Sequence, residues 1–253
     1  RKWGTYEVVG MVFKTYFRLK SVALCRNILR AISAAALPEL GEFPRSQQVT
    51  FRYYVGVLAF LNEEYDRAEA ELEQALKMCH RGAEVNQALI LGYLLPVKLL
   101  RGALPNPALF ESRVGGRLRV YQPFVAAVRA GDVRRFDTAL KHHEASLVKR
   151  GTFIAIERAR DVTLRTLLKR IYLTLPPTVD NVQPTRIALK TLHTASSSAV
   201  VGLRYSENEL EWLLATLIYK GYVKGYIAHE RGVLVLSAKL AFPRLGDVAV
   251  VTT

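Results

Sequence analysis

The sequence predicts a mostly α-helical protein in which a tetratricopeptide-like stack of helices is followed by a winged helix with a small β-hairpin. Two observations predict this fold. Through the first two thirds of the chain, apolar residues recur every three or four positions, which is the period of an amphipathic helix. The C-terminal third contains three helical patterns and then two strand patterns, the order of elements in a winged helix. We therefore expect a helical-repeat region over residues 1–160 and a winged-helix subdomain over residues 161–253, joined as one continuous module.

The first two helices are expected over residues 5–20 and 21–36. In the second of them, Leu24, Ile28 and Ile32 share one face of the helix. Proline and glycine residues then interrupt the helical pattern before residue 46.

Residues 46–80 predict a helical hairpin. A polar turn, Asn62-Glu63-Glu64, separates its two helices, and the small residues Gly56 and Ala68 allow the helices to approach closely. The second helix carries apolar residues at spacings of three and four: Tyr65, Ala68, Leu72, Ala75, Leu76 and Cys79. Such a pair is typical of a helical repeat, whose apolar face needs a neighbouring repeat to cover it.

The middle of the chain continues the helical pattern. A helix is expected over residues 84–100, bent at Pro96, and a linker rich in proline and glycine follows over residues 105–116. Three short amphipathic helices are expected after it, over residues 123–129, 134–149 and 152–160.

The winged helix is expected to contain helices over residues 161–175, 184–194 and 206–221. The third is the best marked, because Ser206 and Glu209 have the spacing of a capping box and Gly221 suits a helix end. Two strands, over residues 222–229 and 233–237, then form the wing.

The chain is strongly basic. It carries 36 Lys and Arg against 22 Asp and Glu, a net charge of +14, and residues 98–160 alone hold 13 basic and 5 acidic side chains. Such a surplus favours an acidic partner, either nucleic acid or an acidic protein, and charge does not decide between them. The longest apolar run, residues 88–97, is too short to span a membrane, which needs about 20 residues.

The termini and the cysteines add two expectations. Because the sequence begins with Arg1 rather than Met, we expect a fragment of a longer protein, and no signal peptide is visible. Two cysteines, Cys25 and Cys79, do not make a disulfide framework and favour a reducing compartment.

Several segments resemble one protein family. They are residues 48–56 (QVTFRYYVG), 93–97 (YLLPV) and 217–227 (LIYKGYVKGYI). They are similar to the PCI-domain subunit of the transcription-coupled mRNA-export complex and to its fungal paralogue, signalosome subunit twelve. Residues 1–6 (RKWGTY) and 228–237 (AHERGVLVLS) are more similar to the fungal paralogue. The resemblance covers nearly the whole chain and implies a PCI domain.

The resemblance also implies a function. Such subunits pair through the winged helix with a second PCI-domain protein, and a small acidic, mostly disordered protein shared with the proteasome lid clamps their helical part. The paired winged helices bind RNA or DNA in the nucleus, in transcription elongation, splicing or mRNA export. The family is non-catalytic and needs no cofactor. The alternative is a purely protein scaffold of a signalosome-type or lid-type assembly, with no nucleic acid.

Nucleic-acid contacts are expected in the winged helix. Phosphate contacts are assigned to Lys220, Lys224 and Arg231, and Tyr226 is placed to stack on a base. On the first helix of this subdomain, three cations lie away from the apolar stripe: Arg165, Lys169 and Arg170. The competing interpretation is structural, because a lysine at a helix C-terminus stabilises the helix dipole and hairpin turns are commonly charged.

Two protein-binding surfaces are expected as well. The wing residues assigned to the second PCI-domain protein are Val223, Ile227, Val233 and Val235. The cations assigned to the acidic partner are Arg113, Arg117, Arg119, Arg134, Arg135, Lys149 and Arg150. A pure solubility role for these cations, and packing of the wing residues within their own domain, are the alternatives.

Catalysis has little support. Adjacent histidines, His142 and His143, diverge by about 100° on a helix and are poorly placed to share a metal ion. His80 beside Cys79 has no second pair at zinc spacing, and Gly115-Gly116 lacks the lysine of a phosphate-binding loop. We therefore expect no enzyme and no metal.

Overall fold

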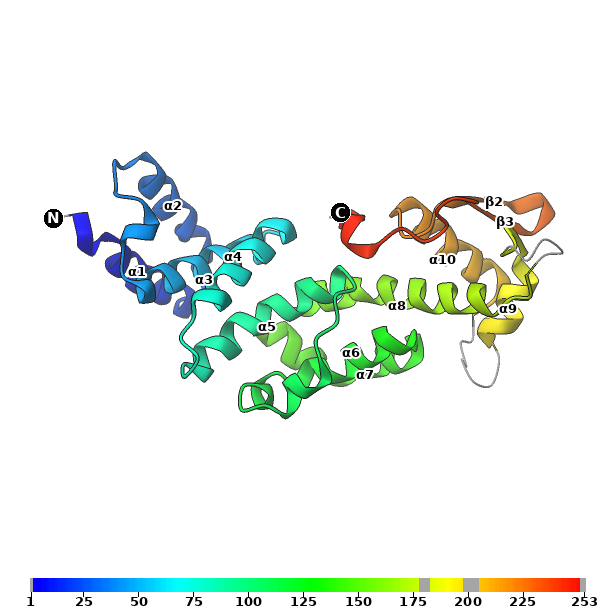
Figure 1. Ribbon diagram of the computed structural model, residues 1–253, viewed down its shortest axis with the longest axis horizontal. Coiled ribbons are helices and arrows are strands. Elements are labelled where there is room, and N and C mark those ends of the chain that lie inside the picture. The colour runs from blue at the N-terminus through cyan, green and yellow to red at the C-terminus, as the bar shows by residue number, and fades with distance from the viewer. Residues whose placement is uncertain (1, 178–182, 198–204, 251–253) are drawn as a thin grey trace. The chain divides into compact units, whose positions relative to one another are not determined.

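The computed structural model describes residues 2–177, 183–197 and 205–250. It divides into two compact units, one of Arg1–Val97 with Ala108–Leu118 and the other of Lys98–Pro107 with Arg119–Thr253. Both units are mainly helical, and the second also holds a small sheet (Figure 1). The structure thus has the mostly α fold that the periodicity predicts.

The first unit contains α1 (Thr5–Arg18), α2 (Cys25–Ala34), α3 (Arg45–Leu61), α4 (Tyr65–Met78) and most of α5 (Glu84–Leu100). Helices α3 and α4 form the predicted hairpin. A Cβ atom at Gly56 would lie 2.7 Å from Cγ of Leu72, so the hairpin closes tightly because this position is glycine. Helix α5 continues through Pro96 to Leu100.

Two apolar clusters hold the first unit together. One joins α3, α4 and α5 through Val57, Leu72 and Ile90. The other joins α1, α2 and α3 through Phe13, Cys25 and Leu58. Each helix therefore packs on a neighbour in sequence, which is the arrangement expected of stacked helical repeats.

The helical part of the second unit contains α6 (Gln122–Ala130), α7 (Val133–Arg150) and α8 (Phe153–Thr174). Gly131 ends α6 with a φ of +71°, a backbone conformation that glycine adopts without strain. Its missing side chain also matters, because a Cβ atom there would lie 2.8 Å from the backbone nitrogen of Leu167 in α8.

The prediction of separate helices over residues 152–160 and 161–175 is wrong, because α8 runs unbroken through both. No proline or glycine lies between Phe153 and Thr174, so nothing in the backbone interrupts the helix. The boundary expected between residues 160 and 161 therefore falls inside one helix, and the two-part division of the chain there remains a prediction.

The winged helix completes the second unit. It adds α9 (Leu189–Ser197) and α10 (Glu207–Tyr219), and a sheet of β1 (Arg186–Ala188), β2 (Gly225–Ala228) and β3 (Val233–Leu236). The sheet is antiparallel, in the order β1-β3-β2. The capping box of α10 is confirmed, with Glu209 N–H donating to Oγ of Ser206 and Ser206 N–H donating back to the Glu209 carboxylate.

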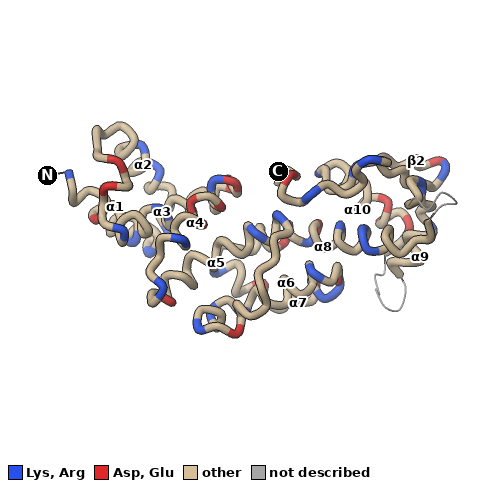
Figure 2. The backbone as a smooth tube through the Cα atoms, in the orientation of Figure 1, with Lys and Arg blue, Asp and Glu red and all other residues tan. Residues whose placement is uncertain are grey.

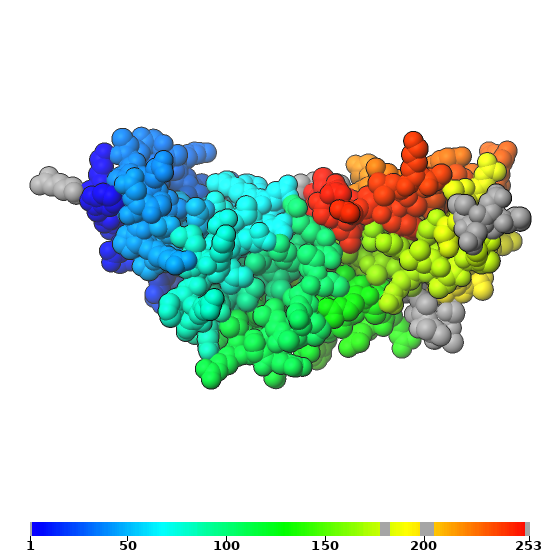
Figure 3. Space-filling view, in the orientation of Figure 1, coloured from blue at the N-terminus to red at the C-terminus, as the bar shows by residue number. Residues whose placement is uncertain are grey.

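The structure corrects the start of this subdomain. The segment expected to be helical from residue 184 begins instead with strand β1, and α9 starts at Leu189. After β3 the chain folds back over its own unit. Arg165 in α8 donates to the Pro243 carbonyl, and the Leu245 side chain lies against Gly102. In Figure 3 the segment after β3, coloured orange-red to red, lies against the green atoms of the same unit. None of the helices in the described ranges is both long and apolar enough to cross a membrane.

Candidate nucleic-acid and partner interface

The outer face of the three-stranded sheet carries side chains that are exposed or half-buried. Side chains directly opposite each other on neighbouring strands share a face, and the register pairs Arg186 with Val235 and Val235 with Tyr226. These three side chains therefore form one row across the sheet, and Tyr226 is 61% exposed. A second row on the same face consists of Ala188, Val233 and Ala228.

The inner face of the sheet belongs to the core. Leu234 is fully buried in the middle of β3, and its neighbours in register are Ile187 and Ile227. Because the side chains of a strand alternate between faces, the outer face must be covered by something else or remain in solvent.

The four wing residues expected at the partner interface do not lie together. Val233 and Val235 are on the outer face of the sheet, where a partner can reach them. Ile227 shares the inner face with Leu234, and Val223 precedes β2 and is only 2% exposed. The first two remain candidates. Val223 is buried in the core and does not fit the expectation, whereas Ile227 is half-buried and its expected partner contact remains a prediction.

Both edges of the sheet are open within the described ranges, because β1 and β2 each pair only with β3. The edge of β2 is the one that lies beside Tyr226. An open strand edge presents unpaired N–H and C=O groups to which another chain can add a strand.

Lys224 and Arg231 lie at the two ends of β2. Lys224 is exposed directly before the strand, and Arg231 is exposed in the turn His229–Arg231 between β2 and β3. Together with Tyr226 between them, they place two cations and an exposed ring along one strand. This is the arrangement expected of a contact to single-stranded nucleic acid, in which phosphates and bases alternate.

Lys220 has a different environment. Its ammonium nitrogen lies 2.7 Å from Oδ2 of Asp161 in α8, and both side chains are mostly buried. The pair fastens the C-terminal end of α10 to α8. Asp161 also lies near Tyr222, where burial, supported by this negative charge, raises the pKa of the tyrosine to about 12.

The three cations expected on α8 also differ from one another. Arg165 is only 7% exposed, donates to the Pro243 carbonyl at 2.7 Å and lies over the ring of Phe242. It is enclosed by its own chain, so the expectation that it contacts phosphate does not fit. Arg170 is exposed but donates to the Ala130 carbonyl at the end of α6, and Lys169 is half-buried.

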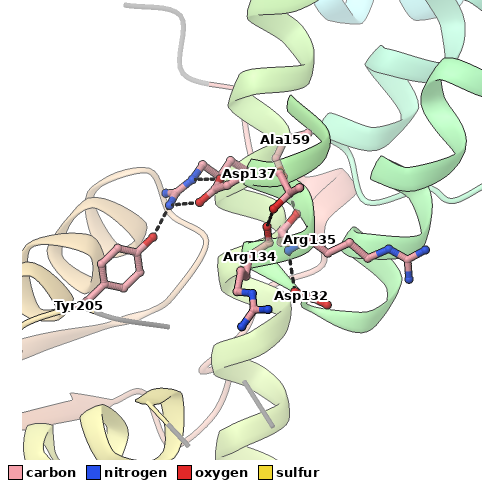
Figure 4. A network of polar contacts seen from close by, with 9 residues as sticks. Asp132, Arg134, Arg135, Asp137, Ala159 and Tyr205 are labelled. Carbon is pink, nitrogen blue, oxygen red and sulfur yellow. Dashed lines mark hydrogen bonds and ion pairs between the residues drawn. The ribbon is translucent and has the colours of Figure 1, made fainter. Parts of the chain in front are cut away.

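A network around Arg160 holds the winged helix against the helical part of the same unit (Figure 4). The guanidinium binds Asp137 of α7 with two parallel bonds, Nε to Oδ1 at 2.7 Å and Nη2 to Oδ2 at 3.0 Å. Nη2 also donates to the hydroxyl of Tyr205, just before the N-cap of α10. The Asp137 carboxylate raises the pKa of Arg160 further above its already high value, so the arginine is charged at every working pH.

The cations expected to meet an acidic partner fall into two groups. Arg113 and Arg117 belong to the first unit, where Arg113 lies 3.5 Å from a carboxylate oxygen of Glu84. The second unit holds the others: Arg119, Arg134, Arg135, Lys149 and Arg150. All are exposed, and Figure 2 marks the Lys and Arg positions along the backbone in blue.

Within the second unit these cations occupy opposite ends of α7. Arg134 and Arg135 are in its first turn and Lys149 and Arg150 in its last, about 22 Å apart at 1.5 Å per residue. Only the second end carries exposed apolar side chains, Val148 beside the cations and Ile154 just across the turn at Gly151. The structure thus divides the predicted acidic-partner surface and gives one part an apolar anchor.

Three exposed residues were missed by the sequence analysis. Arg186 joins the outer row of the sheet because β1 exists, and only the alternation around Ile187 pointed to that strand. Trp212 and Tyr219 are 68% and 81% exposed on α10. Their spacing of seven residues in a helix was a signal that could have found them.

No group of three or more His, Cys, Asp or Glu side chains that could hold a metal ion occurs in the described part of the chain. A groove of about 880 Å³ lies in the first unit between α2, α3 and α4. Leu29, Phe51 and Val55 contribute to its apolar wall, and Arg67 and Glu64, which form an ion pair, to its rim.

Curated relatives match almost the whole chain. It is 70% identical over 257 residues to Protein CSN12 homolog from Mycosarcoma maydis, an alignment that covers 100% of this chain and 57% of that protein. It is 41% identical over 255 residues to Protein CSN12 homolog from Neurospora crassa, covering 97% of this chain and 56% of the relative. It is 33% identical over 254 residues to PCI domain-containing protein 2 from Xenopus laevis, covering 98% and 59%. The chain therefore spans less than two thirds of the length of these relatives. No family model matches it.

Proposed function

Because the chain belongs to the CSN12-like family of PCI-domain proteins, we propose that it is a non-catalytic scaffold subunit of a nuclear complex in mRNA biogenesis. It pairs with a second PCI-domain protein and with a small acidic protein, and it contributes part of a surface that binds RNA or DNA. The processes are transcription elongation, splicing or mRNA export.

The outer face of the wing sheet is the observation that supports this proposal most strongly. Val233 and Val235 are apolar, lie on the middle strand and are only partly covered by their own domain on this side. A partner element packed on this face would cover them, and a strand added to β2 would extend the face. Lys224 and Arg231 at the ends of β2 then lie at the margin of the joint surface, where a phosphate backbone can reach both.

The end of α7 is the part of the helical region that best fits an acidic partner. Lys149 and Arg150 supply charge, and Val148 and Ile154 supply the apolar contact that charge alone does not replace. A partner segment that is acidic and contains an apolar or aromatic residue would match the surface at the C-terminal end of α7.

A salt titration tests nucleic-acid binding. The chain, co-expressed with its PCI-domain partner, is titrated into labelled single-stranded RNA or DNA of 20 nucleotides, or into duplex DNA of 20 base pairs. Each titration is repeated at increasing salt concentrations. Replacing both wing cations, Lys224→Glu/Arg231→Glu, is expected to reduce the slope of log K against log salt by about 2, since each lost phosphate contact removes about one.

The matched control is Lys14→Glu/Arg45→Glu, which makes the same charge change at two exposed residues of the first unit. The proposal holds if the slope of log K against log salt becomes smaller for the wing variant and stays unchanged for the control, while both complexes remain assembled. If both variants retain the slope and the affinity of the wild type, the wing is not a nucleic-acid surface.

A purely protein scaffold is the second candidate function. Two of the expected cations favour it, because Lys220 is neutralised by Asp161 and Arg165 is buried. This candidate predicts weak binding to all three nucleic acids at physiological salt, even in the assembled complex, together with loss of the PCI-domain partner when Val235 is replaced.

A further inference from the structure

Helix α10 presents an aromatic face to solvent. Four leucines, Leu210, Leu213, Leu214 and Leu217, fill its buried stripe. On the other side, Trp212 is 68% and Tyr219 81% exposed, and seven residues place both on one face about 10 Å apart along the helix axis. Ala215 is exposed between them and leaves the space between the two rings open.

The same helix is acidic. Its thirteen residues contain Glu207, Glu209 and Glu211 and neither lysine nor arginine. Hydrogen bonds from the N–H and hydroxyl of Ser206 lower the pKa of Glu209, which keeps this carboxylate ionised. Oε1 of Glu211 lies 2.8 Å from Nδ1 of His229 in the wing turn, which fixes its position near the surface.

This charge pattern argues against nucleic acid on α10. A helix that enters a groove of DNA presents lysine, arginine or amide side chains, since phosphates surround the groove. Three carboxylates in the first half of α10 repel phosphates instead. The exposed cations of the wing, Lys224 and Arg231, lie outside this helix.

Large aromatic side chains in solvent are costly unless a partner covers them. Tryptophan and tyrosine are the residues most enriched among the energetic centres of protein interfaces, where an apolar ring is buried and a polar rim surrounds it. On α10 the rings are Trp212 and Tyr219, and the carboxylates of Glu209 and Glu211 lie on either side of Trp212, about 60° and 100° away around the helix axis. The complementary surface is therefore apolar in the middle and basic at its sides.

We propose that the exposed face of α10 docks a basic amphipathic helix of a partner protein. Apolar side chains of that helix pack on Trp212 and Tyr219, and its lysines or arginines lie against Glu209 and Glu211. The two rings span about two helical turns, so a helix of a few turns is long enough. This surface shares no residue with the wing sheet or with the end of α7, so its test is independent of the proposed function.

Peptide display on the full chain tests the proposal. A library of 16-residue peptides is selected on the wild-type chain, with counter-selection on Trp212→Ala/Tyr219→Ala. We expect the enriched peptides to carry net positive charge with apolar residues every three or four positions. The best of them, labelled with a fluorophore, is expected to bind the double variant at least tenfold more weakly by anisotropy, and Glu209→Gln/Glu211→Gln several-fold more weakly.

The control is Leu173→Ala/Leu240→Ala, which removes two other exposed apolar side chains of the same unit and is expected to leave affinity unchanged. The aromatic and leucine variants change exposed side chains, whereas Glu211 is half-buried, and circular dichroism checks that each variant is folded. Failure to enrich peptides over the counter-selected variant, or enrichment of acidic peptides, overturns the proposal.

Tryptophan fluorescence distinguishes the other occupants. The chain has two tryptophans, so Trp3→Phe leaves Trp212 as its only tryptophan. In this background the selected peptide is expected to shift the emission, and a 20-nucleotide RNA is expected to leave it unchanged. Quenching by the RNA would assign α10 to nucleic acid. Self-association that is lost in Trp212→Ala/Tyr219→Ala would assign it to a second copy, and either result contradicts the proposal.

Discussion

The ammonium nitrogen of Lys220 lies 2.7 Å from the carboxylate of Asp161, so the last turn of α10 is tied to the middle of α8. The two side chains are 27% and 18% exposed, which limits the screening of their attraction by water. A residue expected to contact phosphate therefore acts within the fold.

Replacing Asp161 by Asn tests this role. The change leaves a mostly buried ammonium group without its counter-charge, and we expect a loss of about 1–2 kcal/mol in the free energy of unfolding, between the values for exposed and buried pairs. Denaturant unfolding measures it, with the exposed Asp247→Asn as control. Equal stability of the two variants would mean that the pair contributes nothing, and Lys220 would return to the set of candidate phosphate contacts.

We expect the contribution of Arg160 to stability to depend on the geometry of its guanidinium group and not only on its positive charge. Arg160→Lys keeps the charge but cannot make the two parallel bonds to Asp137, so we expect it to lose most of the roughly 2–3 kcal/mol that Arg160→Ala loses. A double-mutant cycle with Asp137→Ala measures the coupling. Full rescue by lysine would show that only the net charge at this position matters.

The capping box predicts that the contribution of Glu209 to stability depends on pH. Ser206 lowers the pKa of Glu209 in the folded chain, so ionised Glu209 contributes stability above its ordinary pKa of about 4.3. That contribution is lost as the pH falls through the lower, folded-state pKa. We expect Glu209→Gln to be less stable than wild type at pH 7 and the difference to shrink towards pH 3, as followed by thermal unfolding. A difference that is the same at both values would exclude the charge as its cause.

Replacing glycine by alanine is expected to have opposite effects on stability at two positions of the first unit. Gly56→Ala places a Cβ atom 2.7 Å from Leu72, and the resulting overpacking is expected to cost about 1–3 kcal/mol. Gly92→Ala in α5 meets nothing within 4 Å and is expected to stabilise the helix by about 0.5–1 kcal/mol. Denaturant unfolding of both variants measures the difference, and destabilisation by both would mean that the contact with Leu72 is not the reason.

Substitutions on the two faces of β3 are expected to affect different properties. A change on the outer face affects binding of the partner, and a change on the inner face affects the stability of the fold. Val235→Lys changes the outer face and is expected to keep the melting temperature close to wild type while the PCI-domain partner no longer copurifies. Leu234→Lys places a charge in the core and is expected to unfold the winged helix. Copurification of the partner with folded Val235→Lys would remove the outer face from the proposed interface.

The sequence predicted elements whose signals are local. Ser206 and Glu209 lie three residues apart, and the cap they form is confirmed together with α10. The helical hairpin around Gly56 is confirmed for the same reason. The family is confirmed by the 70% identity to a fungal CSN12 homologue, and residues 217–227, which carried that resemblance, include the end of α10.

Features that depend on distant parts of the chain were not predictable in this way. Strand β1 has three residues and is a strand because it pairs with β3, 45 or more positions later. Arg165 is buried by a bond to Pro243, 78 positions away, although its spacing on α8 matched an exposed face. The partners at the interface itself are outside the chain, so the roles of Lys224, Tyr226 and Arg231 remain predictions.

The continuity of α8 has a mechanical consequence. Arg160 and Asp161 are neighbours in this helix and point about 100° apart, one towards α7 and the other towards α10. If α8 turned about its own axis, it would strain both attachments at once, so α8 couples the orientation of the wing to that of α7. Helix α8 is about 33 Å long and carries both attachments. A force that a partner applies to the winged helix is therefore transmitted through α8 to the helical part of the same unit.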